Sequence, residues 1–148
     1  NDLYDNTLIV FTSDNGVTYS GGTDGEYFNS SGQFGEEYGK AKGFVYEGGI
    51  RVPMIASWPN HIKPESTTDL VSAHYDVMAT LSELVEFEKP LDTDGISFLP
   101  TLLGKDNQVK HEFLFWEYPE YGGQVAIRMG DWKVVRQNLK NKKKTVNN

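Results

Sequence analysis

Residues 7–12 form an unbroken run of β-branched and apolar side chains, Thr-Leu-Ile-Val-Phe-Thr, and Ser-Asp-Asn-Gly follows at once. A continuous apolar run of this length, without polar alternation, is typical of a strand buried on both faces, as in a parallel sheet covered by helices. Residues 13–16 have turn chemistry and end the strand. Because ligands of open α/β sheets bind outside the carboxyl ends of the strands, this turn is a candidate site.

Three further segments follow before residue 92. Residues 17–43 are rich in Gly, Ser, Tyr and Glu without a sustained period, which predicts a long loop. Residues 52–58 predict a second strand, with a proline near its start, where a missing N–H does least harm. Residues 72–86 predict a helix whose N-cap is Ser72 or Asp76. Its apolar face is marked by Val71, Tyr75, Met78, Leu81, Leu84 and Val85.

The last third of the chain changes character. Residues 92–105, broken by glycines and a proline, predict a loop. Residues 113–116, 125–129 and 132–136 predict three strands, and Gly130-Asp131 is a two-residue hairpin signal between the last two. Strands without an intervening helix favour an antiparallel sheet. We therefore expect a parallel α/β portion to about residue 105, followed by an antiparallel β portion.

Composition excludes several classes of function. The 148 residues carry a net charge of −7, which argues against nucleic-acid binding. No apolar run approaches the ~20 residues of a membrane-spanning helix, and the absence of cysteine excludes disulfides and thiolate–zinc sites. We interpret the one basic cluster as a solvated end rather than a binding patch; it contains Lys140, Lys142, Lys143 and Lys144.

Asp14 and Asn15 are the first residues that point to chemistry. A carboxylate beside an amide carbonyl offers two hard oxygen ligands, which suit Ca²⁺ or Mg²⁺ better than zinc. Taken alone, the same Ser-Asp-Asn-Gly sequence also makes a tight turn, and both interpretations stay open.

Residues 40–53 contain a second candidate group, in which Lys40 and Lys42 precede a Gly-Gly pair. A lysine ammonium in a glycine-rich setting can contact an anionic oxygen, although for either lysine alone we favour a surface residue ahead of a turn. We expect Glu47 and Arg51 to form a structural ion pair rather than to act as catalysts.

The combination of these segments closely resembles the type I sulfatases, the arylsulfatase-like members of the alkaline phosphatase superfamily. The most specific stretch is residues 46–53, Tyr-Glu-Gly-Gly-Ile-Arg-Val-Pro. The resemblance runs in order through nearly the whole chain, at residues 13–16, 42–53, 57–59, 76–81, 94–100 and 126–133. It implies an alkaline-phosphatase-like α/β fold in part, with a small antiparallel β subdomain after it.

The resemblance also implies roles for individual residues. Asp14 and Asn15 would bind the active-site divalent cation, usually calcium. The lysine four residues before the tyrosine of Tyr-Glu-Gly-Gly would contact the sulfate ester, which selects Lys42 rather than Lys40. Residues 1–105 would be the C-terminal part of the catalytic domain, and residues 106–148 the start of the C-terminal subdomain. The parent would be a sulfuric ester hydrolase acting on sulfated carbohydrates or aryl sulfates, in the periplasm or outside the cell.

The chain departs from the family pattern at the nucleophile. The family's formylglycine arises from Cys or Ser in a Cys/Ser-x-Pro-x-Arg motif; there is no cysteine here, and the one Ser-x-Pro, at residues 57–59, is followed by Asn60-His61. Ala79 stands where the family usually has proline. The chain has no initiator methionine, so we expect a piece of a longer protein, cut at both ends and inactive by itself. An apolar sheet edge left by the cut would favour self-association.

Two other functions stay open at this stage. One is a phosphoryl-transfer hydrolase of the same superfamily, against which residues 46–53 argue. The other is a non-catalytic binding module. Two further groups are ambiguous: His74 is expected to be structural rather than a general base, and Tyr118, Glu120 and Tyr121 either face a sugar substrate or form an aromatic loop on the surface.

Overall fold

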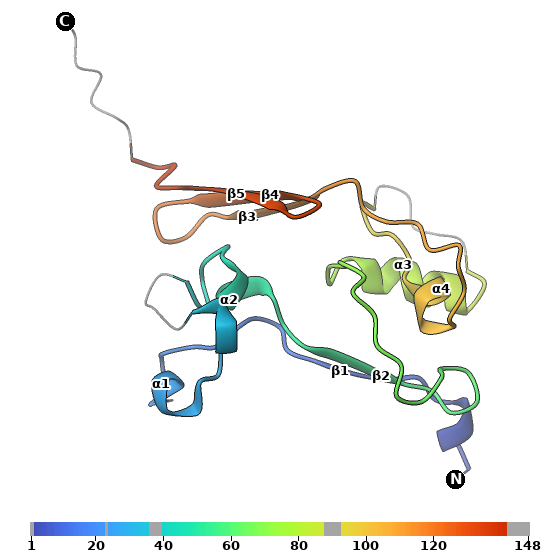
Figure 1. The fold of residues 1–148 in the computed structure, drawn as a ribbon. Coiled ribbons are helices and arrows are strands. Elements are labelled where there is room, and N and C mark those ends of the chain that lie inside the picture. The colour runs from blue at the N-terminus through green and yellow to red at the C-terminus, as the bar shows by residue number, and fades with distance from the viewer. Residues whose placement is uncertain (1, 23, 36–39, 88–92, 142–148) are drawn as a thin grey trace, which may run out of the picture. The chain divides into compact units, whose positions relative to one another are not determined.

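The computed structural model describes residues 2–22, 24–35, 40–87 and 93–141 (Figure 1). The chain forms two compact units, one of residues 1–11 and 54–112 and the other of residues 12–53 and 113–148. Along the chain the elements are η1 (Tyr4–Asn6), β1 (Ile9–Thr12), α1 (Gly25–Phe28), η2 (Gly32–Phe34), α2 (Glu47–Ile50), β2 (Met54–Ser57), α3 (Asp76–Leu84), α4 (Leu99–Leu102), β3 (Leu114–Tyr118), β4 (Gln124–Met129) and β5 (Trp132–Gln137).

The strands β1 and β2 form a two-stranded sheet and run in opposite directions. The Thr12 hydroxyl donates a hydrogen bond to the Pro53 carbonyl at 2.9 Å, and the Gly16 N–H donates to the Gly49 carbonyl at 2.9 Å. From Thr12 to Gly16 the chain advances by four residues, while the partner goes back by four, from Pro53 to Gly49. Opposite shifts of equal size are typical of antiparallel strands. Both predicted strands are confirmed, but the parallel arrangement expected for them is wrong.

All four residues of β1 are exposed, and Phe11 keeps 67% of its surface. The expectation that this strand is buried on both faces is therefore wrong for the described residues. The physical reason is that β2 is its only sheet partner in the part of the chain that the structure describes. A run of apolar side chains indicates that a strand is suited to burial, but the strand is buried only where other elements cover its faces.

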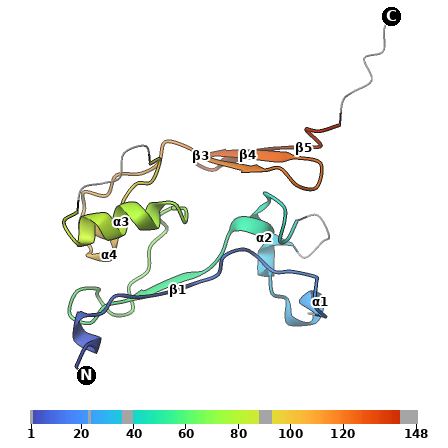
Figure 2. The same ribbon diagram turned by 180° about the vertical axis from the view of Figure 1, so that it is seen from behind.

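The predicted antiparallel sheet of the last third is confirmed, with strand order β3-β4-β5, and is visible from both sides in Figures 1 and 2. Residues 114 to 118 of β3 pair with residues 128 to 124 of β4, and residues 124 to 129 of β4 pair with residues 137 to 132 of β5. Gly130 has a φ of 54° and lies first in the two-residue turn after Met129, the position at which type II′ hairpins favour glycine.

The first unit has its core on one side of α3. Thr80, fully buried, donates its hydroxyl to the Asp76 carbonyl at 2.8 Å and accepts the Phe98 N–H at 3.0 Å. Ala79, Phe98 and Leu99 are buried with it. The side of α3 that carries small and polar residues is thereby fixed to the segment that leads into α4 by hydrogen bonds as well as by apolar contact.

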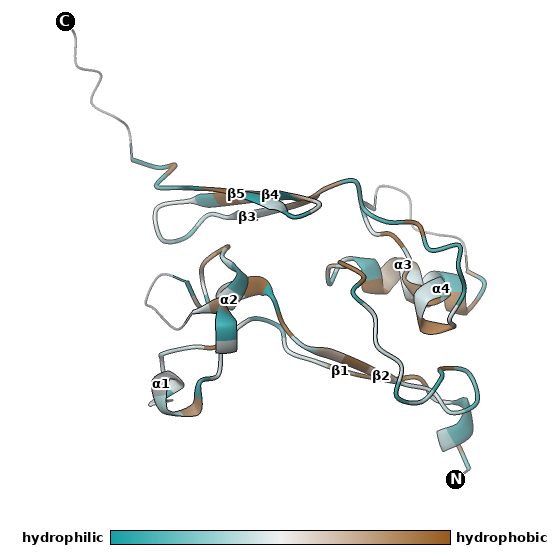
Figure 3. Ribbon diagram, viewed as in Figure 1, coloured by the Kyte–Doolittle hydropathy of each residue, from teal (hydrophilic) through white to brown (hydrophobic). Residues whose placement is uncertain are grey.

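The residues predicted to form the apolar face of this helix are mostly exposed. Figure 3 shows the hydropathy of each residue along the ribbon. Met78 keeps 59% of its surface and Val85 68%, whereas the buried residues of α3 are Asp76, Ala79, Thr80 and Ser82. The helix predicted from the periodicity is confirmed, but within the described residues no element covers its apolar side chains. Neither predicted cap holds: Tyr75 is the N-cap, and it makes no side-chain capping bond.

The predicted loops contain short helices. Residues 17–43 include α1 and η2, each about one turn long, and residues 92–105 include α4, with Pro100 in its first turn, where proline is tolerated. Parts of the predicted loops (residues 23, 36–39 and 92) and most of the basic cluster (Lys142, Lys143 and Lys144) lie outside the described residues.

Candidate functional site

The turn after β1 presents two oxygen-bearing side chains. Asn15 donates from its Nδ2 to the Gly16 carbonyl at 3.0 Å, and the Ser13 hydroxyl donates to the Asn15 carbonyl at 2.8 Å. The hydrogen bond from Nδ2 orients the Asn15 amide and leaves its Oδ1 available as a ligand. Asp14 is exposed, and no hydrogen bond or ion pair within the described residues occupies its carboxylate or Asn15 Oδ1. Both oxygens are hard donors of the kind that calcium prefers, so the turn fits half of a cation site.

Two glycines of residues 46–53 allow this turn to lie directly against backbone. A Cβ added at Gly16 would overlap the Gly48 carbonyl, and one added at Gly49 would overlap the carbonyl oxygens of Ala41 and Phe44. At Gly48 an added Cβ would lie 2.7 Å from the Lys40 carbonyl oxygen. The Gly-Gly pair is therefore required by close packing of chain against chain, as its sequence suggested.

Lys42 lies beside the same turn through its backbone. Its N–H donates to the Val17 carbonyl at 2.8 Å, three residues after Asp14, and its side chain is exposed. The Cδ of Lys40 lies 3.7 Å from where a Cβ on Gly35 would be, so that side chain lies along Gly35. The structure brings Lys42 and the Asp14-Asn15 turn together along the backbone; the direction of the Lys42 ammonium stays a prediction.

Glu47 is bound by three cations. Its carboxylate lies 2.6 Å from Lys133 Nζ, 3.6 Å from a terminal guanidinium nitrogen of Arg51 and 3.7 Å from one of Arg128. The pair with Arg51 was predicted and is confirmed. Burial alone would raise the pKa of the Glu47 carboxyl, but the hydrogen bond from Lys133 and the three positive charges outweigh it and hold that pKa below its ordinary value.

The cluster fastens α2 to the three-stranded sheet, because Arg128 belongs to β4 and Lys133 to β5. Aromatic rings lie against two of its cations: Lys133 Nζ is 5.1 Å from the centre of the Trp116 ring, and the Arg51 guanidinium is 4.6 Å from that of Phe34. Sequence reasoning missed the two sheet cations, which lie about 80 residues beyond Glu47 without a local pattern that links them.

Gln124, fully buried at the start of β4, fixes the segment that carries Lys42. Its Nε2 donates to the Gly43 carbonyl at 3.0 Å, and its Oε1 accepts the Val45 N–H at 3.4 Å and Gln137 Nε2 at 3.3 Å. A buried amide satisfied at both ends specifies one geometry, because the loss of any partner would leave a polar group without a hydrogen bond. No local pattern around Gln124 indicated this role.

Aromatic rings flank the residues that follow Lys42. Tyr121 stacks on Phe44, with ring centres 5.1 Å apart and 20° between the planes, and its centre lies 6.2 Å from that of Tyr118. The loop packs on residues 43–44 and Tyr121 is exposed, which is compatible with both interpretations, a surface aromatic loop and a loop that faces a sugar substrate. No hydrogen bond or ring contact of Glu120's side chain is found within the described residues.

A second polar cluster lies in the first unit. His111 Nε2 lies 2.8 Å from Asp76 Oδ1, and the two oxygens of Asp76 also accept the N–H groups of Ala73 and Ile96. Burial, and then the charges of Asp76 and Asp94, raise the pKa of Tyr75, whose ring meets that of His111 edge-on at 5.6 Å. Asp76 is buried with every oxygen bonded, which is the pattern of a structural carboxylate.

His74, which was expected to be structural, is exposed and lies two residues before the start of α3. It takes no part in the contact between Asp76, which was predicted only as a possible N-cap, and His111, which sequence reasoning had not singled out.

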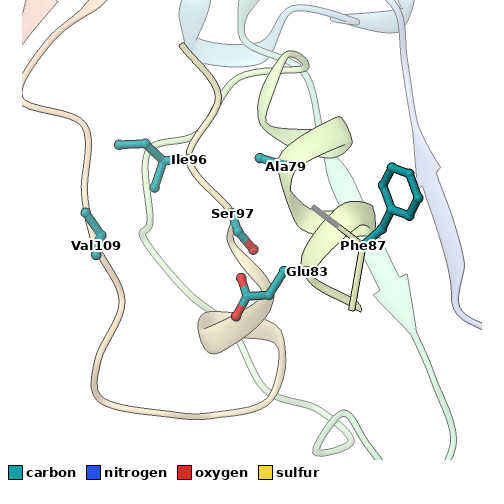
Figure 4. A pocket seen from close by; sticks show the side chains of 6 residues that line it. All are labelled: Ala79, Glu83, Phe87, Ile96, Ser97 and Val109. Carbon is teal, nitrogen blue, oxygen red and sulfur yellow. The ribbon is translucent and has the colours of Figure 1, made fainter. Parts of the chain in front are cut away.

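The first unit also contains a pocket of about 470 Å³ (Figure 4). It is lined by Ala79, Glu83, Phe87, Ile96, Ser97 and Val109, and contains none of the candidate site residues. Across the described ranges no three His, Asp or Glu side chains lie close enough together to hold a metal ion. No helix within those same ranges is long and apolar enough to cross a bilayer.

Known proteins resemble this chain over most of its length. The family model described as N-sulphoglucosamine sulphohydrolase, C-terminal, matches residues 35–143. Arylsulfatase A of Bos taurus is 36% identical over 134 residues, which are 88% of this chain and 25% of that protein. N-acetylgalactosamine-6-O-sulfatase of Bacteroides thetaiotaomicron is 35% identical over 138 residues, 90% of this chain and 26% of that one. The chain thus spans about a quarter of the length of the curated relatives that it matches.

Solved structures are also similar to this chain. Ps i-CgsB superimposes with a TM-score of 0.70 at 32% identity, covering 91% of this chain and 28% of its own. A protein solved with its substrate D-glucosamine-2-N,6-O-disulfate gives 0.69 at 28%, covering 94% and 27%. The phosphonate monoester hydrolase of Silicibacter pomeroyi, with 0.67 at 24%, shares the fold alone. The family match and the sulfatase relatives are consistent with one another, and the chain belongs to the sulfatase family, in whose alkaline-phosphatase-like fold it matches the C-terminal portion.

Proposed function

We propose that this chain is the C-terminal segment of a sulfuric ester hydrolase and supplies part of its active site. In the proposal Asp14 and Asn15 bind the divalent cation, and Lys42 contacts the sulfate of the substrate. The observation that supports it is the pair of backbone contacts, Gly16 with Gly49 and Lys42 with Val17, which hold the two candidate groups against the same turn.

The chemistry follows from the charge of the substrate. In sulfate ester hydrolysis the sulfo group passes to the nucleophile, and the bridging oxygen leaves with the electron pair of the S–O bond. Positive charge near the sulfate oxygens and the leaving oxygen therefore favours the transition state. Calcium, bound by Asp14 and Asn15 together with ligands from elsewhere in the protein, would supply such charge. Lys42 would add a compact ammonium, and Gln124, by holding residues 43 and 45, would limit its movement.

The proposal assigns the nucleophile, a formylglycine, to another part of the protein, because the chain has no cysteine and no serine in the required motif. This segment by itself is then inactive, because a nucleophile, charge stabilisation and proton transfer act as a unit. Within the segment, residues 1–105 would belong to the catalytic domain and residues 106–148 to the start of the C-terminal subdomain.

The proposed substrates are sulfated carbohydrates or aryl sulfates, and the proposed location is the periplasm or the outside of the cell. Relatives named as an N-acetylgalactosamine-6-O-sulfatase and as a ulvan-active sulfatase support the carbohydrate class. The exposed apolar side chains of β1, Phe11 above all, support the further proposal that the isolated segment self-associates through that sheet.

Steady-state kinetics of the full-length protein with nitrophenyl sulfate and calcium test the function. Lys42→Ala should lower kcat/KM by about 100-fold or more, because it removes charge stabilisation of the transition state. Lys40→Ala is the matched control, two residues away, and should stay within about threefold. Equal losses in both variants would refute the role of Lys42. Faster turnover of a phosphate ester would favour a phosphoryl-transfer hydrolase, and turnover of neither ester would favour a binding module.

A further inference from the structure

The loop between β3 and β4 places one exposed aromatic ring on the residues next to Lys42. Tyr121 keeps 57% of its surface, while one face of its ring stacks on Phe44 at 5.1 Å. The ring edge also covers Gly43: a Cβ added at this glycine would lie 2.6 Å from Tyr121 Cε2 and 3.3 Å from Cδ2. Gly43 is the immediate neighbour of Lys42, about 3.8 Å away between Cα atoms.

This placement is fixed by the backbone of the loop. Tyr121 itself has a φ of 50°, and Gly122 and Gly123 follow with φ of 86° and 79°. A positive φ is costly for a tyrosine, though not for the two glycines, so Tyr121 keeps this conformation only where surrounding contacts hold it. The Lys140 N–H donates to the Gly122 carbonyl at 2.8 Å, and the Leu139 N–H donates to the Gly123 carbonyl at 3.2 Å. The tyrosine is therefore presented in one position rather than on a loose tip.

Both sides of the contact are anchored to the same strand. Gln124 directly follows this loop, and its buried amide holds the Gly43 carbonyl and the Val45 N–H. The distance between the Tyr121 ring and the backbone of Lys42 is thus set by one short, hydrogen-bonded connection. A tyrosine ring that packs on Phe44 and still keeps 57% of its surface exposed offers a flat apolar surface with a polar tip.

We propose that Tyr121 is a specificity-determining residue that stacks on the sugar ring whose sulfate ester Lys42 contacts. The inference rests on the proposed function and deepens it, because it selects sulfated carbohydrate as the substrate class. The C–H face of a pyranose is apolar and flat enough to lie on an aromatic ring, while its hydroxyl edge stays in water. Phe44 supports the ring from behind, so the ring does not have to be ordered on binding.

Inhibition and turnover by the full-length protein test this role with two probes. The first is a set of singly sulfated monosaccharides: N-acetylgalactosamine 6-sulfate, glucosamine 6-sulfate and galactose 4-sulfate. The second is inorganic sulfate, which has no ring to stack. Tyr121→Leu keeps an apolar side chain on Gly43 and Phe44 but removes the aromatic face. It should raise KM for the preferred sugar about tenfold, a factor that matches the upper range for one aromatic stacking contact. Its inhibition constant for inorganic sulfate should stay within about twofold.

Two further variants make the result specific to stacking. Tyr121→Phe should keep KM for the sugar within about twofold, and an equal loss in both Tyr121 variants would overturn stacking in favour of a hydroxyl contact. Tyr27→Leu is the control, because Tyr27 is also exposed, at 80%, and also contacts a phenylalanine, Phe28. It should leave both constants unchanged.

The outcomes also separate this inference from the proposed function. If the wild type hydrolyses no sulfate ester, the proposed function fails. If it hydrolyses aryl sulfates but none of the sugars, or if Tyr121→Leu leaves KM for the sugar unchanged, the proposed function stands and the role of Tyr121 is refuted.

Discussion

Glycines 16, 48 and 49 let two backbone segments approach more closely than any side chain would allow. The Gly16 N–H meets the Gly49 carbonyl at 2.9 Å, and at each of the three positions an added Cβ would collide with a carbonyl group. Because the obstacles are backbone atoms rather than flexible side chains, they cannot move aside at low cost. The turn that carries Asp14 and Asn15 therefore packs this closely only because residues 16, 48 and 49 are glycines.

Gly49→Ala should destabilise the protein by about 2–3 kcal/mol, because the new methyl group overlaps the carbonyl oxygens of Ala41 and Phe44. Thermal or urea unfolding measures the change. Gly25→Ala is the control, because the atom nearest to a Cβ there is a tyrosine ring carbon at an ordinary 3.5 Å. If Gly49→Ala is as stable as Gly25→Ala, the close approach of the two segments is wrong.

At this scale the sequence predicted contacts between near neighbours better than distant ones. Glu47 and Arg51 are four residues apart on one turn, so their pairing follows from helix geometry. Lys133 and Arg128 reach Glu47 only because the chain folds back, and Gln124 reaches Gly43 for the same reason. The roles of Asp14, Asn15 and Lys42 depend on atoms beyond this chain and stay predictions.

Among the secondary-structure elements, the short helix α2 owes its position to charge. It has four residues and no side-chain capping bond, and an isolated helix of this length is unstable. The carboxylate of Glu47 in its first turn links it to β4 through Arg128 and to β5 through Lys133. The antiparallel sheet thus serves as the base on which residues 46–53 are held.

Glu47→Gln should lower stability by about 1 kcal/mol at pH 7, because it removes ion pairs that are partly exposed. Since the pKa of Glu47 is lowered on folding, its contribution is present above the ordinary carboxyl pKa and is lost as pH falls through the lowered value. The difference in Tm between variant and wild type should therefore shrink as the pH falls from 7 to below the ordinary carboxyl pKa and through the lowered pKa of Glu47. Glu117→Gln, an exposed carboxylate on β3, should show no such difference. A constant difference across pH would contradict the ion-pair account.

Elements whose sequence has a strong local pattern were predicted, whereas elements stabilised by contacts with other parts of the chain were not. Within the described residues, all five strands lie where apolar runs and turn residues placed them, within about two residues at each end. α4 was missed because Pro100 and Gly104 are typical of loops, although proline fits the first turn of a helix. α3 is shorter than predicted, and its burial is reversed because hydrogen bonds of Asp76 and Thr80 fix its polar side.

For the whole molecule, the number of cation ligands sets the expected affinity. Asp14 and Asn15 supply at most about three of the six to eight oxygens that calcium takes. This chain should therefore bind Ca²⁺ with a millimolar dissociation constant or not detectably, as calorimetry can measure, and Asp14→Ala should change little. Micromolar binding that Asp14→Ala abolishes would mean that the site is complete within these residues.

The convergence of both candidate groups on one sulfate is tested most directly by a crystal structure of the full-length protein with calcium and sulfate. We expect the Asp14 carboxylate and Asn15 Oδ1 to coordinate the cation at about 2.3–2.6 Å. The Lys42 ammonium should lie about 3 Å from a sulfate oxygen, with Lys40 directed elsewhere. A Lys42 side chain turned to solvent in an ordered loop, beside a sulfate that other residues hold, would contradict the account.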